Sequence, residues 1–134
     1  MANEVVARFL DGKVIKGVSL DVDPNRPICH VRTGERRMVE VKLTTLKALY
    51  FVKDLVGDTK RDDSTLLAEA DERSHGSYPI DIEFIDGERL VGFTVRYPPI
   101  RPFFFVLPAD VRSNNIRVLV NRAAVKRMQQ PAGG

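Results

Sequence analysis

Arginine pairs are the first residues of this chain whose type and spacing suit ligand chemistry. Arg32 and Arg36 lie four positions apart, and two guanidinium groups at that spacing can hold a phosphate through paired hydrogen bonds. Arg26 and Arg101 each precede a proline in a polar loop, where a guanidinium can contact an anionic ligand. Each pattern has a structural alternative. The first pair suits a basic surface turn, and the second can bind strand carbonyls or a carboxylate such as Asp23, which is the favoured interpretation.

Three consecutive phenylalanines, Phe103, Phe104 and Phe105, are the second candidate for ligand binding. Neighbouring side chains of a strand point to opposite faces, so Phe104 is expected on one face and the other two rings on the opposite face. Exposed rings hold the bases of single-stranded nucleic acid by stacking. Covered rings fill a core between two parts of the chain or form a homo-oligomer interface, and core filling is the favoured interpretation.

Nucleophiles and metal ligands are sparse in the sequence. Cys29 and His30 are adjacent, but adjacent strand residues point to opposite faces, so they do not form a thiolate–imidazole pair. The other histidine is His75, and one cysteine with two histidines does not make a metal site. We therefore expect no enzymatic activity, no metal and no cofactor.

Composition indicates a globular chain that has no membrane partner. The sequence is 43% apolar and 29% charged, and no apolar run approaches the roughly 20 residues of a transmembrane helix. The first residues lack the basic and apolar regions of a secretory signal, and a single cysteine is typical of a reducing compartment. The expected location is the cytoplasm.

Charge divides the chain into three segments. Residues 1–57 carry 10 Lys/Arg and 7 Asp/Glu, and residues 78–134 carry 8 and 5, so each segment has a net charge of +3. Residues 58–77 carry 3 and 6, a net charge of −3. We interpret residues 58–77 as a solvated acidic linker between two units.

An internal repeat is the strongest signal in the sequence. Residues 5–17 align with residues 80–92 at a constant offset of 75, and the offset becomes 79 at Val39 and Val118. The two copies share a phenylalanine, an Asp-Gly dipeptide and a later glycine: Phe9 and Phe84, Asp11-Gly12 and Asp86-Gly87, Gly17 and Gly92. A repeat of this extent predicts that both copies adopt the same fold.

Each copy is expected to form five short strands. Apolar and charged residues alternate through 80–84, Asp-Gly indicates a type I′ hairpin turn, and the proline-rich loops cannot lie within a sheet. The mid-strand glycines Gly17 and Gly92 are interpreted as bulges or sharp bends. After the first strand of each copy, the expected strands are 14–20, 28–31, 38–43 and 46–52, and 89–95, 103–107, 116–120 and 125–128.

These patterns predict an all-β fold of two tandem five-stranded small barrels. The units are residues 1–57 and residues 78–134, the second with a frayed C-terminal tail. Residues 58–77 form the linker, with at most one short helix. A core of about 50 residues is only marginally stable alone, so the units are expected to pack on each other or on a second chain.

The order of motifs resembles the Sm-like and SH3-like small barrels. More closely, it resembles an uncharacterised bacterial tandem-repeat small-barrel domain that occurs alone or attached to signalling modules. Residues 9–23 are similar to the first Sm motif, and residues 82–95 repeat it. The resemblance implies RNA binding through two loops, for which the first copy offers Asp21 or Asp23 with Asn25. The second copy has Arg, Pro and Ile in those places, and the glycine of the second loop is missing from both copies.

The spacing of Arg32 and Arg36 is also similar to that of the PilZ domain, which implies cyclic-dinucleotide binding. The partner motif of that domain has only an imperfect match at residues 62–67, where its glycine is missing.

The expected function is a non-catalytic binding or regulatory module that acts through protein–protein interaction and self-association, so its partner is another protein or a second copy. The candidate partner-binding residues are Arg26, Arg32, Arg36, Arg101, Phe103, Phe104, Phe105 and Arg122. The alternative is binding of RNA or single-stranded nucleic acid through basic loops, and cyclic-dinucleotide binding is a more distant one. The residues available for phosphate contacts are Arg26, Arg32, Arg36, Arg37, Arg101, Arg112, Arg117, Arg122, Lys126 and Arg127.

Overall fold

The computed structural model describes residues 3–34, 36–55, 76–110 and 112–131, and these residues form β-strands and two short 3-10 helices. The expected all-β class is confirmed. The first five strands are β1 (Asn3–Phe9), β2 (Val14–Ser19), β3 (Ile28–Thr33), β4 (Arg37–Lys42) and β5 (Leu46–Val52), with η1 (Leu43–Thr45) before β5. The other five are β6 (Tyr78–Phe84), β7 (Arg89–Thr94), β8 (Phe103–Pro108), β9 (Asn115–Asn121) and β10 (Val125–Gln129), with η3 (Arg122–Ala124) before β10.

The expected short helix of the linker falls mainly on residues 58–75, which lie outside the described residues. Within the described ranges, no helix has the length and apolar character that crossing a membrane requires.

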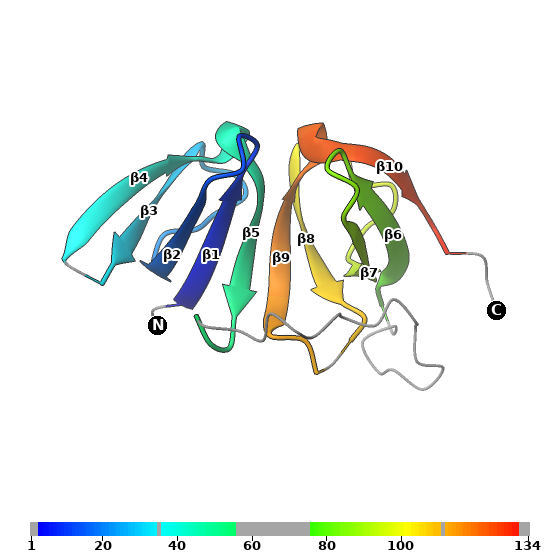
Figure 1. The fold of residues 1–134 in the computed structure, drawn as a ribbon. Helices are drawn as coiled ribbons and strands as arrows, with labels where there is room; N and C mark the ends of the chain where they lie inside the picture. Colours follow the sequence, from blue (N-terminus) through cyan, green and yellow to red (C-terminus); the bar gives the residue numbers. More distant parts are fainter. Residues whose placement is uncertain (1–2, 35, 56–75, 111, 132–134) are drawn as a thin grey trace.

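The ten strands form one antiparallel sheet in the order β10-β6-β7-β8-β9-β5-β1-β2-β3-β4. We call β1–β5 the first half and β6–β10 the second half, and they lie side by side with β5 and β9 in the centre (Figure 1). The first half has the order β5-β1-β2-β3-β4 and the second half has the matching order β10-β6-β7-β8-β9.

The sheet is open, and the expectation of two five-stranded barrels is not confirmed. The reason is that β5 pairs with β9 along its length, with Ala48 opposite Val120 and Tyr50 opposite Val118, so the two halves share one hydrogen-bonded sheet. We call this pairing the junction. The ends of the sheet are β4 and β10, and each pairs with one other strand in the part of the chain that the structure describes.

The two halves match in register as well as in strand order. Between β1 and β5 the register shifts after Arg8, which is opposite Ala48. Between β6 and β10 the shift falls at the corresponding place, with Glu83 opposite Arg127. This agreement assigns each residue of β10 a counterpart in β5, 79 positions earlier, and each residue of β6 a counterpart in β1, 75 positions earlier.

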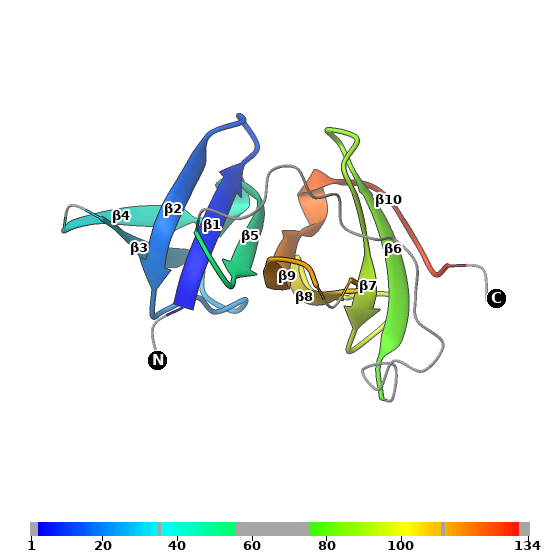
Figure 2. The same cartoon turned by 60° about the horizontal axis from the view of Figure 1, so that its bottom comes forward.

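Two apolar cores lie on the two faces of the junction. The turned view shows β5 and β9 side by side between the two halves (Figure 2). All seven residues of β5 are buried. Ala48, Tyr50 and Val52 enter the core of the second half, whereas Leu49 and Phe51 enter the core of the first half. A strand that is buried on both faces carries few polar side chains, which explains the apolar run of residues 48–52; Lys47 is the one charged residue of β5.

The two Asp-Gly turns differ from the expected type I′ geometry. Gly12 and Gly87 have positive φ angles, but no aspartate among the described residues does. In the first turn the Gly12 N–H donates to the Phe9 carbonyl and the Phe9 N–H donates to the Lys13 carbonyl. This pattern is a three-residue loop with glycine in the left-handed position. Asp11 accepts a hydrogen bond from the Lys13 N–H at 2.9 Å, which explains the aspartate.

Gly17 and Gly92 are needed for close backbone contact. The pairing of β2 with β1 and of β7 with β6 runs through them without a register shift, so neither glycine is a bulge. A Cβ atom at Gly17 would overlap the carbonyl of Arg32, and one at Gly92 would overlap the carbonyl of Leu107. Only glycine therefore lets β3 and β8 approach β2 and β7 so closely.

The substitution Gly92→Ala is expected to lower the free energy of unfolding by about 2 kcal/mol or more, because the new methyl group forces two backbones apart. Gly34→Ala is the matched control, since a Cβ atom there meets nothing within 4 Å and Gly34 lies outside the left-handed region. Chemical denaturation of both variants measures the difference. Equal stability of the two variants would contradict the close approach.

Candidate binding surface on the second half

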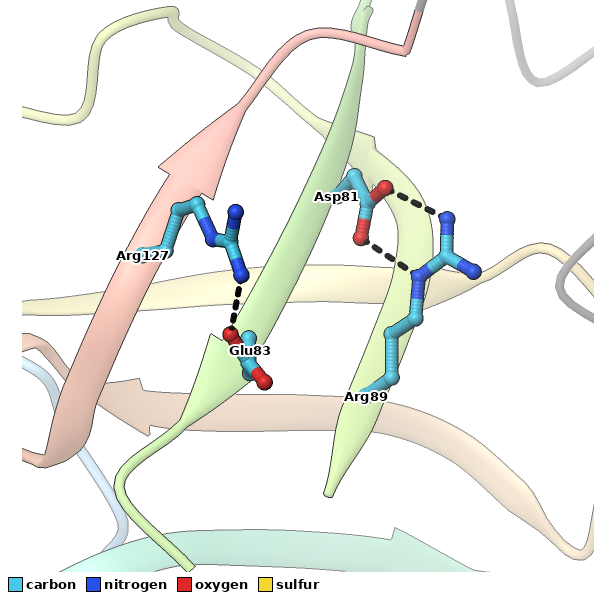
Figure 3. Close-up of polar contacts among 4 residues, drawn as sticks. All are labelled: Asp81, Glu83, Arg89 and Arg127. Carbon is cyan, nitrogen blue, oxygen red and sulfur yellow. Dashed lines mark hydrogen bonds and ion pairs between the residues drawn. The ribbon is translucent and has the colours of Figure 1, made fainter. Parts of the chain in front are cut away.

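The outer side of the second half presents two arginine–carboxylate pairs (Figure 3). Asp81 and Glu83 come from β6, Arg89 from β7 and Arg127 from β10. Together with Gly87 and Gln129 they line a depression of about 310 Å³. We call the four charged residues the charged face.

Asp81 and Arg89 form the stronger pair of the charged face. The Arg89 Nε donates to Asp81 Oδ1 at 3.0 Å and Nη2 donates to Oδ2 at 2.6 Å, a two-point contact (Figure 3). The Asp81 side chain is 9% exposed, and the hydrogen bonds from Arg89 lower the pKa of its carboxyl group. Asp81 is therefore ionised and held in one orientation.

Glu83 and Arg127 form a more exposed pair, in which Arg127 Nη2 donates to Glu83 Oε1 at 2.7 Å. The hydrogen bond from Arg127 lowers the pKa of Glu83. All four charges of the face are thus present at neutral pH and arranged as ordered pairs.

Three positions of the first half that match this surface are covered by the second half, whereas Arg8 and Val14, the counterparts of Glu83 and Arg89, are exposed. Val6 is the counterpart of Asp81, Ala48 of Arg127 and Tyr50 of Gln129. All three lie in the core of the second half and are at most 7% exposed. The surface that the first half uses to hold its neighbour is therefore open and charged in the second half.

A cluster of polar side chains holds the halves together beside the junction. Lys47, whose side chain is 9% exposed, contacts Asp86 Oδ2 at 2.7 Å and Glu88 Oε2 at 3.0 Å. The Tyr50 hydroxyl donates to Glu88 Oε1 at 2.9 Å. Lys47 also lies 4.8 Å from the centre of the Phe84 ring. We call Lys47, Tyr50, Asp86 and Glu88 the Lys47 cluster.

The Lys47 cluster shifts the pKa values of its members in the directions that burial and charge require. Burial and the charge of Glu88 raise the pKa of Tyr50 well above its usual value, so the phenol stays protonated. Burial acts to raise the pKa of Asp86, but the Lys47 ammonium and the Glu88 N–H outweigh it, and the pKa is lowered.

Three of the predicted arginines lie near the junction and have polar partners. Arg26 is 3.8 Å from Asp23, Arg101 donates to Asn25, and Arg122 donates to the Pro99 carbonyl. The contact between Arg101 and Asn25 joins the loop before β8 to the loop before β3. These arginines brace loops in the structure.

Arg32 and Arg36 lie apart from the other predicted arginines. They belong to the β3–β4 hairpin, which points away from the second half (Figure 1). Arg36 has a φ angle of 61°, so it occupies a tight turn. Arg32 and Arg36 therefore lie apart from the predicted arginines that brace loops near the junction.

The three phenylalanines lie on the two faces of β8 as the alternation predicts. Phe104 is 8% exposed and lies in the core of the second half. Phe103 and Phe105 are partly buried against the core of the first half, and Phe105 lies 5.9 Å from the Phe51 ring. Arg117 covers both Phe51 and Phe105 at 4.2 and 4.5 Å from the ring centres.

Cys29 and His30 also point to opposite faces. Cys29 is buried, and burial together with the charge of Asp21 raises the pKa of its thiol to about 11. His30 is half exposed and its Nδ1 lies 2.7 Å from Asp21 Oδ2. A thiol of this pKa is not a nucleophile at neutral pH.

The charged face was not predicted as a site from the sequence. Asp81 and Glu83 fit an ordinary strand face, and Arg127 was one of ten possible phosphate contacts. The available signal was the comparison of the copies, because Val6 and Ala48 are apolar where Asp81 and Arg127 are charged.

A family model described as a family of unknown function, DUF6982, matches residues 1–132. No curated protein and no solved structure matches the chain.

The variant Asp86→Asn/Glu88→Gln is expected to lose about 3 kcal/mol of unfolding free energy, because it leaves a buried ammonium group without a counter-charge. Lys47→Met is expected to cost less, within about 1 kcal/mol, because the half-exposed carboxylates that remain are solvated by water. Urea denaturation of both variants tests this order. The reverse order would show that the Lys47 cluster does not stabilise the contact between the halves.

Asp81→Asn is expected to destabilise the protein by about 1–2 kcal/mol at neutral pH. The folded-state pKa of Asp81 is below the ordinary value of 3.8, so its stabilising effect is present above that value and is lost as the pH falls through the folded-state pKa. The difference between wild type and variant should therefore shrink as the pH falls below about 3.8. Denaturation curves across the acid range measure it, and a difference that does not change with pH would contradict an ion-pair effect.

Proposed function

Because the chain belongs to the DUF6982 family, whose function is unknown, we propose its role from its own geometry: it is a non-catalytic module that binds another protein. The binding site is the open end of the second half, formed by the charged face and the edge strand β10. The proposal includes a cytoplasmic location, where the single cysteine remains reduced.

The observation that carries the proposal is the difference between the outer faces of the two halves. In the first half, β1 and β5 hold a neighbour through Val6, Ala48 and Tyr50. In the second half, the matching face of β6 and β10 has no neighbour among the described residues and presents ordered charges instead. The second half carries ordered charges at positions where the first half makes apolar contacts, so this surface suits a partner that is recognised by charge.

Strand addition is the binding mode that the geometry favours. β5, the counterpart of β10, has β9 hydrogen-bonded along its outer edge. β10 is an edge strand, and an edge strand accepts an extended segment through its main-chain groups. Its side chains Lys126 and Arg127 are exposed, so we propose that the segment is extended and acidic.

The fold proposed for this module is a tandem pair of small barrels. The matching strand orders and the matching register shifts of the two halves support it, together with the resemblance to the Sm-like and SH3-like barrels. The two halves share the junction, so they act as one scaffold.

Two observations favour protein binding over the alternatives. The candidate phosphate contacts are scattered: Arg32, Arg36 and Arg37 lie at the β3–β4 hairpin, Lys126 and Arg127 lie on β10, and Arg26, Arg101 and Arg122 have polar partners in or beside the loops that they brace. The three phenylalanines are wholly or partly covered by the cores, so they do not form a platform for bases. The absence of catalysis is supported by the buried Cys29 thiol with its raised pKa.

Selection of random short peptides on the immobilised protein tests the binding site. We expect enrichment of acidic, β-prone peptides whose affinity falls about tenfold, or roughly 1.4 kcal/mol, in the variant Lys126→Glu/Arg127→Gln. The matched control is Arg37→Gln/Lys42→Glu on the other edge strand, which carries the same change of charge and should bind like wild type. Failure to enrich such peptides, or equal loss in both variants, would overturn the site.

Titration with random single-stranded RNA at low and high salt tests the main alternative. Because any affinity for nucleic acid is strongest at low salt, that condition is the most sensitive test. We expect no RNA binding even at low salt. A salt-sensitive affinity would replace protein binding with nucleic-acid binding as the function.

A further inference from the structure

The junction joins two different surfaces of the same repeat. The first half contributes β5, and the second half contributes β9, which is the counterpart of β4. The two edge strands are therefore the counterparts of the two strands that pair at the junction: β10 corresponds to β5, and β4 corresponds to β9. An interface of this kind can repeat from one copy to the next and produce rings or filaments.

The register of the junction shows what such a contact between copies would bring together. Leu49 is opposite Leu119 at the junction. The counterparts of these residues are Met128 and Glu40, so a contact between copies would place a carboxylate in the apolar position of Leu119. Burying an unpaired carboxylate is strongly unfavourable.

Like charges would meet one step further along the same pair of strands. Ala48 is opposite Val120 at the junction, so their counterparts Arg127 and Val41 would be opposite each other in a contact between copies. The same register would place Lys126 opposite Lys42. Like charges directly opposite each other destabilise a strand pair. In the junction the position of Lys42 is taken by Asn121, whose side-chain amide donates to the Leu46 carbonyl at 2.8 Å.

In a contact between copies, the residues that correspond to the Lys47 cluster would carry a net positive charge in place of a net negative one. Lys126 is the counterpart of Lys47, and Asp11 and Lys13 are the counterparts of Asp86 and Glu88. Lys13 would therefore face Lys126 in the place where Glu88 contacts Lys47 at 3.0 Å. The remaining carboxylate, Asp11, already lies 3.9 Å from Lys13.

We propose that Lys13, Glu40 and Lys42 prevent the two ends of the sheet from pairing between copies. This proposal departs from the self-association that we expected from the sequence. On the first half, three unfavourable contacts replace three favourable ones. On the second half, the charged Asp81 and Arg127 also stand where Val6 and Ala48 make apolar contacts at the junction. The strand pairing of the junction therefore forms within each chain and not between chains. This inference goes beyond the proposed function, because it concerns a second copy and holds whichever partner binds β10.

The test gives the first half the junction residues of the second half. The triple variant Lys13→Glu/Glu40→Leu/Lys42→Asn introduces the counterparts Glu88, Leu119 and Asn121. It is made in the background Asp81→Val/Arg127→Ala, which introduces the counterparts Val6 and Ala48 on the second half and is itself expected to remain monomeric. Sedimentation velocity is expected to show wild type as a monomer from micromolar to millimolar concentration. The triple variant is expected to assemble, with an average mass that at least doubles as its concentration rises.

Two further variants distinguish specific strand pairing from nonspecific association. Adding Lys126→Glu to the triple variant places like charges together at the new contact and is expected to restore the monomer. Lys16→Glu/Glu4→Leu changes exposed residues of the same types away from the edges and is expected to remain monomeric. A monomeric triple variant would overturn the proposal. So would assembly that Lys126→Glu does not reduce, or a wild-type oligomer that Lys126→Glu disrupts.

Discussion

The burial of β5 on both faces is the constraint on which the rest of the structure depends. A strand in which all seven residues are buried needs a hydrophobic cover on each side and a hydrogen-bonded neighbour on each edge. The first half supplies β1 and one cover, and the second half supplies β9 and the other cover. Burying one large apolar side chain is worth about 1.5–3 kcal/mol, so β5 alone accounts for a large share of the attraction between the halves.

The two halves diverge in sequence at the surfaces that the junction requires, and they agree where the strands of each half are built. Gly17 and Gly92 both allow a neighbouring strand to approach closely, because a Cβ atom at either position would overlap a backbone carbonyl. The two Asp-Gly turns have the same hydrogen bonds. In contrast, Glu88 and Lys13 occupy matching positions with opposite charges, and only Glu88 has a lysine from the other half to contact. The two halves therefore share the residues that build each set of five strands and differ in the residues that make the contacts between the sets.

Much of the fold could be predicted from local patterns in the sequence. The alternation in 80–84, the prolines of the loops and the repeat itself are local properties, and the strands were found within a few residues of their observed ends. The pairing of β5 with β9 is not local, because it joins residues about 70 positions apart whose apolar runs would fit either a closed barrel or a shared sheet. The charged face was missed for a related reason: Asp81 and Arg127 become informative only when the cover over Val6 and Ala48 is known.

The shared burial of β5 also makes the protein one cooperative unit. In many repeat proteins each unit contacts only its neighbours, so stability is a sum of local terms and the array can unfold in parts. Here the loss of the second half would expose Ala48, Tyr50 and Val52 to water, and the loss of the first half would uncover Leu119 and Phe105. Because each half would expose core residues if the other half unfolded, we expect the two halves to unfold together in a single transition.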